Sequence, residues 1–118
     1  MKYLCLIYDN EQEWQKFPKD VQQKYMGEYR EFTESIQKTG QYIGGNQLAP
    51  THTGTVVRSR NGKLSTTDGP YAETKEQLGG YYLIDAKDLN DAIKVAARIP
   101  SARFGAIEVR PIMESNGA

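Results

Sequence analysis

The residue whose type and setting best suit chemistry is Asp68, the first residue of an Asp-Gly-Pro turn. Gly69 permits backbone angles that other residues avoid, and Pro70 fixes its own φ and lacks an N–H donor, so the turn holds the carboxylate in a defined place. A carboxylate presented in this way at the edge of an apolar pocket is suited to act as a general acid or base, or to accept a hydrogen bond from a ligand hydroxyl. A structural role is the alternative, because aspartate before glycine often accepts backbone N–H groups of its own turn. The sequence leaves both roles open.

Two further side chains are candidates for proton transfer beside Asp68. His52 is the only histidine of the chain, and histidine is the side chain that titrates nearest to neutral pH. Its position in a predicted loop nevertheless favours a solvated role over a catalytic one. Tyr29 could hydrogen-bond a ligand, although its place in an apolar helical pattern favours a role in the core. The candidates for catalysis are therefore Asp68, His52 and Tyr29.

Residues around the turn are candidates for ligand binding, namely Arg58, Gly69, Pro70, Tyr71 and Tyr81. Arg58 lies on a predicted strand whose hairpin partner leads into Asp68, an arrangement that favours a cross-strand ion pair. A single histidine and a single cysteine, Cys5, argue against a metal site built from several such residues within one chain. The glycine pairs lack the spacing and the following helix of a phosphate-binding loop. We expect neither a metal nor a nucleotide cofactor.

Hydrophobic patterning predicts the elements that must position these residues. Apolar side chains on both faces from Lys2 to Tyr8 predict a central strand, followed by a loop or short helical turn from Asp9 to Lys16. Apolar residues at helical spacing predict a helix from about Pro18 to Lys38. Further strands are predicted at 42–48, 55–60, 63–67, 81–86 and 106–112, with a hairpin turn at Asn61-Gly62. The tail from Glu114 to Ala118 is polar.

A second helix is predicted to begin after Asp88, which has the features of an N-terminal cap. Its buried face is expected to comprise Leu89, Ala92, Ile93, Ala96 and Ala97. Pro100 is expected to end the helical segment.

Leaving the hairpin aside, the predicted order is strand, helix, strand, strand, helix, strand. This is the split βαβ arrangement of a ferredoxin-like α+β domain, here with an inserted β-hairpin. Right-handed crossovers place both helices on one face of the sheet. The other face is also apolar, and no third helix is predicted, so a second copy of the chain is the simplest cover. The sequence predicts one domain over residues 1–118, assembled as a homodimer.

The stretch from Asp68 to Tyr82 reads Asp-Gly-Pro-Tyr-Ala-Glu-Thr-Lys-Glu-Gln-Leu-Gly-Gly-Tyr-Tyr. It closely resembles the signature of the DGPF group of the YciI-related proteins, and flanking matches extend the resemblance over nearly the whole chain. The resemblance implies a dimeric α+β barrel in which two sheets pack face to face. In some of the YciI-like proteins that this chain resembles, a histidine of the first helix is paired with an acidic residue. The position that we align with this histidine is Tyr29. Their chemistry therefore does not transfer directly.

Composition restricts the partners and the compartment. Fifteen basic and fifteen acidic residues give a net charge of zero, and no Lys/Arg block is present of the kind that grips phosphates, so direct contact with nucleic acid is not expected. No apolar run has the length of a signal-peptide core or of a membrane span. We expect a cytoplasmic protein with no membrane association.

Two functions remain open from the sequence. The first is a cofactor-independent enzyme that moves a proton on a small aromatic or carbonyl-bearing molecule, with Asp68 in the pocket; this rests on analogy of fold. The second is a non-catalytic ligand-binding or regulatory module, because relatives resemble proteins encoded beside, or fused to, extracytoplasmic-function sigma factors. An enzyme should hold its carboxylate in an enclosed cavity with a second titratable group in reach.

Overall fold

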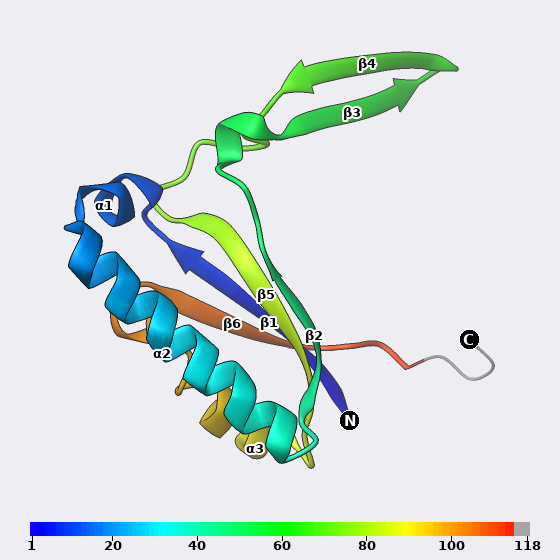
Figure 1. The fold of residues 1–118 in the computed structure, drawn as a ribbon. Helices are drawn as coiled ribbons and strands as arrows, with labels where there is room; N and C mark the ends of the chain where they lie inside the picture. Colours follow the sequence, from blue (N-terminus) through cyan, green and yellow to red (C-terminus); the bar gives the residue numbers. More distant parts are fainter. Residues whose placement is uncertain (115–118) are drawn as a thin grey trace.

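The computed structural model describes residues 1–114, and the predicted polar tail lies outside this range apart from Glu114. A four-stranded antiparallel sheet has the order β2, β5, β1, β6. Its strands are β1 (Lys2–Asp9), β2 (Tyr42–Gln47), β5 (Gln77–Asp85) and β6 (Ala106–Pro111), and the long helices are α2 (Lys19–Lys38) and α3 (Leu89–Ala96). Both helices lie on one face of this sheet (Figure 1). The prediction of a ferredoxin-like α+β fold with an inserted hairpin is confirmed.

We call the four-stranded sheet with the elements packed on it the body of the domain. Three short elements complete it, namely helix α1 (Glu11–Lys16) and the 3-10 turns η1 (Thr51–Thr53) and η2 (Pro100–Arg103). Helix α1 begins where the Asn10 side chain accepts hydrogen bonds from two backbone N–H groups of the first turn. This cap accounts for a helix in a segment that the sequence predicts as a loop or short helical turn. Trp14 of α1 packs edge-on against Phe17, with ring centroids 5.8 Å apart.

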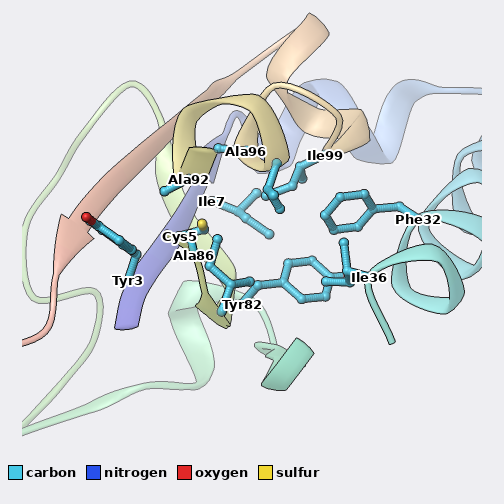
Figure 2. Packing of buried hydrophobic residues seen from close by; sticks show 12 residues of the cluster. Tyr3, Cys5, Ile7, Phe32, Ile36, Tyr82, Ala86, Ala92, Ala96 and Ile99 are labelled. Carbon is cyan, nitrogen blue, oxygen red and sulfur yellow. The ribbon is translucent and has the colours of Figure 1, made fainter. Parts of the chain in front are cut away.

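The core lies between the central strand β1 and the two long helices. On β1 the odd-numbered residues Tyr3, Cys5 and Ile7 are buried and face the helices. Figure 2 shows Phe32 and Ile36 of α2 at one end of the buried cluster and Tyr3 of β1 at the other, with Ala92 and Ala96 of α3 lying over the strand. Burying a large apolar side chain such as Ile7 or Phe32 stabilises the folded state by about 1.5–3 kcal/mol. The sheet and both helices are therefore held by one shared core.

Helix α3 begins as predicted, because the Asp88 carboxylate accepts a hydrogen bond from the Asp91 N–H at 2.9 Å. Its predicted buried face is partly wrong: Leu89 and Ile93 are each 48% exposed, and Ala97 is exposed as well. The buried residues are Ala92, Val95 and Ala96. Small side chains let the helix lie close to the sheet, which places the two larger residues at the edge of the contact and brings in Val95.

The opposite face of the sheet is apolar at its centre. The even-numbered residues Leu4 and Leu6 of β1 point to this face and pair with Leu83 and Tyr81 of β5. All four are half-buried, although no helix of the described chain lies over them (Figure 1). We refer to this surface as the open face.

A second, two-stranded sheet consists of β3 (Thr55–Arg60) and β4 (Lys63–Asp68). Asn61 and Gly62 both have positive φ, 54° and 76°, which confirms the predicted hairpin turn. The hairpin projects away from the main sheet (Figure 1), and we call it the arm. The radius of gyration is 16.4 Å, whereas a compact domain of this length has about 13.5 Å. The arm is thus an extension that the core of the body does not cover.

Candidate functional site

A cavity of about 600 Å³ lies between helix α2 and the strands β2 and β5, with α1 and η2 at one end. Its volume falls in the range of small-molecule sites. Trp14, Met26 and Tyr42 supply apolar wall, whereas Asp9 and Ser101 supply polar groups. The cavity therefore combines an apolar body with a localised polar end.

Asp9 is the last residue of β1 and continues the odd-numbered row that faces the helices. Because side chains alternate along a strand, the position after Ile7 in this row also points to the helix side of the sheet. A Cβ at Gly79 would lie 3.5 Å from Asp9 Oδ1, so the glycine leaves open space beside the carboxylate. The strand thus places a half-buried carboxylate where its pattern would otherwise place another core residue.

Ser101 connects Asp9 to Tyr29. Its side chain is only 2% exposed, and its Oγ donates to Asp9 Oδ2 at 3.4 Å. Ser101 Oγ also makes a hydrogen bond with the Tyr29 hydroxyl. A serine hydroxyl carries one proton, so when Ser101 donates to Asp9 it accepts from Tyr29. The three side chains form a hydrogen-bonded chain that links α2, η2 and the end of β1.

The surroundings of this chain change its acid–base properties. Burial raises the pKa of Asp9 above its ordinary value of 3.8; the Ser101 hydrogen bond opposes this shift, and the negative charges of Glu11 and Glu76 add to it. Burial also raises the pKa of Tyr29 to about 12. The site accordingly places a carboxylate with raised proton affinity beside a tyrosine that keeps its proton at neutral pH.

A pair of hydroxyl-bearing residues also lines this cavity. Thr33 Oγ1 and the Tyr82 hydroxyl lie 2.7 Å apart, and both residues line the cavity. A Cβ at Gly45 would lie 2.9 Å from the Tyr81 carbonyl oxygen and 2.9 Å from the Tyr82 ring. The wall at this point therefore requires glycine on β2.

Glu11 ties the cavity to the base of the arm. Its carboxylate accepts hydrogen bonds from Thr51 N at 2.8 Å and from Thr51 Oγ1 at 2.9 Å. Its backbone N–H donates to Gln77 Oε1 at 3.0 Å. Glu11 thereby fixes η1, the turn from which the arm departs, against the start of α1.

A second cavity of about 380 Å³ lies at the base of the arm and shares Leu48 and Pro50 with the first. Three predicted ligand-binding residues, Gly69, Pro70 and Tyr71, contribute to its wall. The Gly69 N–H donates to the Gly54 carbonyl oxygen at 2.6 Å, and the Gly69–Pro70 peptide bond is cis.

Gly69 has a packing explanation. A Cβ on this residue would lie 2.9 Å from the carbonyl oxygens of both Gly54 and Thr51. Atoms at that separation overlap, so any larger residue would push the strand away from η1. Close backbone contact at the base of the arm accounts for this glycine of the Asp-Gly-Pro turn.

The other predicted site residues lie in different surroundings. Tyr29 and Tyr81 line the larger cavity, whereas Asp68 and His52 are exposed and lie in the wall of neither cavity. Arg58 lies opposite Ser65 rather than Asp68, and its guanidinium carbon is 5.7 Å from the centroid of the Tyr71 ring. The predicted Arg58–Asp68 ion pair is not formed within residues 1–114. The catalytic assignments of Asp68 and His52 stay predictions.

Asp9 and Ser101 are not among the site residues predicted from the sequence. A signal for Asp9 exists, because the odd-numbered row of β1 continues to it. No comparable pattern marks Ser101 as a site residue; the sequence shows only that it follows Pro100.

Within 1–114 no three His, Cys, Asp or Glu side chains are arranged to hold a metal ion. No helix in this range is both long and apolar enough to cross a membrane.

Matches to known proteins include a family model, a related sequence and a solved structure. The family model of the YCII-related domain matches residues 1–116. An uncharacterized protein of Rhizobium meliloti (strain 1021) is 32% identical over 114 residues, which cover 95% of this chain and 92% of that protein. A 5-chloro-2-hydroxyhydroquinone dehydrochlorinase from Burkholderia phenoliruptrix AC1100, solved in complex with 2,5-dihydroxybenzoquinone, has a TM-score of 0.57 at 12% identity, with 98% of this chain and 96% of that chain covered. This last likeness is one of fold.

Proposed function

The chain belongs to the YCII-related domain family, and we propose that it is an enzyme that moves a proton on a small molecule without a cofactor. The substrate binds in the 600 Å³ cavity, and Asp9 is the group that takes up and returns the proton. The observation that carries the proposal is the half-buried Asp9 carboxylate, hydrogen-bonded to buried Ser101 at the polar end of an apolar cavity. Titratable groups with shifted pKa values in such cavities are candidates for acid–base catalysis.

In the proposed reaction, ionised Asp9 accepts a proton from a carbon or oxygen atom of the substrate. The electron pair of the broken bond moves toward an oxygen of the substrate, and the protonated Asp9 then returns the proton to a second atom, so the enzyme is unchanged at the end. Thr33 Oγ1 donates to the Tyr29 carbonyl oxygen and therefore accepts from the Tyr82 hydroxyl. The Tyr82 proton is the one that turns to the substrate oxygen that gains charge. Ser101 and Tyr29 hold the Asp9 carboxylate in place.

The kind of substrate follows from the walls of the cavity. Aromatic side chains, among them Trp14, Tyr42 and Tyr82, suit a planar or apolar molecule. The dehydrochlorinase that shares the fold was solved with a quinone, and by analogy of fold this supports an aromatic or carbonyl-bearing substrate.

Proton transfer can be tested before the natural substrate is known. Small ketones, quinols and phenols would be incubated with the protein in deuterium oxide, and protein-dependent deuterium incorporation followed by NMR. We expect exchange into at least one compound with the parent, and a loss of at least about 100-fold with Asp9→Asn. Binding of a compound without exchange would instead support the alternative of a ligand-binding or regulatory module.

We further propose that the chain forms a homodimer through the open face. Leu4, Leu6 and Leu83 form an apolar centre there, and stable interfaces of this kind often bury more than about 2,000 Å² in total. Light scattering at micromolar concentration is expected to give about twice the 13.3 kDa of the chain. A monomer under these conditions would contradict the assembly. As a second check, Leu6→Glu should give a folded monomer.

A further inference from the structure

We propose that the larger cavity accepts uncharged or cationic ligands that donate a hydrogen bond to Asp9, and that it rejects anions such as carboxylates and phosphates. This inference rests on the proposed function, because it concerns the same site. It goes further by assigning the charge and hydrogen-bonding class of the molecule that binds.

The charged groups around the cavity all have one sign. Asp9 and Glu11 lie in its wall, and no Lys, Arg or His of the described residues lines it. Glu76 is close enough to act on Asp9 through its charge. A ligand carboxylate beside Asp9 would meet negative charge without a cation to compensate it, and partial burial strengthens that repulsion relative to water.

The hydrogen-bonding groups point to the same class of ligand. The Ser101 proton is directed to Asp9, and the Tyr29 hydroxyl is bonded to Ser101. Ionised Asp9 carries only acceptor sites. A ligand group that meets its remaining lone pairs must therefore donate a proton, as a hydroxyl or an ammonium does and a carboxylate does not.

Uncharged groups supply the rest of the polar wall. Gln15 and Gln47 are among the residues that line the cavity, and their amide side chains can both donate and accept hydrogen bonds. They can therefore bind further ligand oxygens without favouring an anion. The apolar wall next to them receives the body of the ligand, which we expect to be a ring.

A matched set of three compounds tests the charge preference. Benzyl alcohol, benzylamine and benzoate share a ring and differ in one polar group, which is neutral, cationic or anionic at pH 7.5. Their dissociation constants would be measured by ligand-observed NMR titration into the millimolar range. We expect the alcohol and the amine to bind at least tenfold more tightly than benzoate. In Asp9→Asn the disadvantage of benzoate should fall to less than about threefold.

Two control variants locate the binding. Met26 is 46% exposed at the cavity wall, so Met26→Trp should narrow the opening and weaken the alcohol and the amine together. Leu64→Ala, on the arm, should change neither. If benzoate bound the parent as tightly as the alcohol, the proposed charge preference would be wrong, whereas the assignment of the cavity as the binding site would not be contradicted. If Met26→Trp weakened the binding of none of the three compounds, both the proposed ligand class and the proposed site would be overturned.

Discussion

Asp9 and Asp68 each end a strand, yet their surroundings have little in common. Asp9 is half-buried, accepts a hydrogen bond from Ser101 and faces a 600 Å³ cavity. Asp68 ends β4 at the base of the arm and is exposed. The comparison shows that a recognisable turn does not by itself bury a carboxylate or give it a fixed side-chain partner. For Asp9 both come from the body of the domain.

The difference extends to the regions that carry the two residues. The body has a core in which Phe32, Ile36 and Cys5 are almost fully buried. On the arm, Val57 is 60% and Leu64 is 72% exposed. The body therefore supplies stability within one chain, whereas the arm contributes little to it.

The largest effect is expected from truncation in the body. Phe32→Ala should lower the free energy of unfolding by about 3–5 kcal/mol, because it removes a buried aromatic ring that packs edge-on against Tyr82. Leu64→Ala is the matched change on the arm and should cost less than about 0.5 kcal/mol. Denaturant titrations of both variants measure the difference. A large cost at Leu64 would mean that the arm is covered in the assembled protein.

The second effect separates the two aspartates directly. Asp9→Asn should reduce catalysed deuterium exchange at least about 100-fold while stability stays within about 1 kcal/mol, since Asn keeps the shape and one acceptor oxygen. Asp68→Asn is the matched change at the turn, and the exchange rates of both variants would be compared. The prediction that Asp68 is catalytic requires a loss of similar size there. A loss confined to Asp68 would contradict the assignment of Asp9.

The third effect concerns the base of the arm. Gly69→Ala should cost about 1–3 kcal/mol, because the added methyl group overlaps two carbonyl oxygens. Gly44→Ala is the control, since a Cβ there meets nothing within 4 Å. Thermal melts compare the two variants. Equal melting temperatures would show that the arm can shift without cost.

The smallest effect is the pH dependence contributed by Asp9. Burial raises its pKa in the folded chain above the ordinary value of 3.8, so folding favours the protonated form. The stability from this group is complete below pH 3.8 and is lost as the pH rises through the folded pKa. Asp9→Asn should therefore equal or exceed the parent in stability at pH 7, and the difference should shrink toward pH 3. Denaturant midpoints of the parent and the variant at the two pH values measure this difference. If the parent instead became more stable relative to the variant as the pH rises, the predicted sign of the effect would be wrong.

Local patterns in the sequence predict most of the fold. Strand β1, helix α2, the Asn61-Gly62 turn and the Asp88 cap each depend on residues close together in the chain. The buried face of α3 was less predictable, because packing against the sheet decides which of several apolar residues point inward.

The candidate site was harder to predict because it depends on distant residues. Ser101 and Asp9 are 92 positions apart, and no local pattern brings them together. The sequence predicts Asp9 as the start of a loop or short helical turn, because the segment from Asp9 to Lys16 is polar. Its burial depends on η2 and α2, which fold over the end of that strand.

Cys5 gives the chain a built-in chemical handle. It is the only thiol among the 118 residues, it is fully buried, and burial raises its pKa to about 11. Because an exposed thiolate is the nucleophile that attacks thiol-labelling reagents, labelling of the parent should proceed only when the core opens. Its rate would therefore measure how often the body unfolds. A cysteine introduced on the arm, as in Leu64→Cys, would react first and alone, so a fluorescent dye or spin label could be attached there to follow the arm without protecting the native thiol.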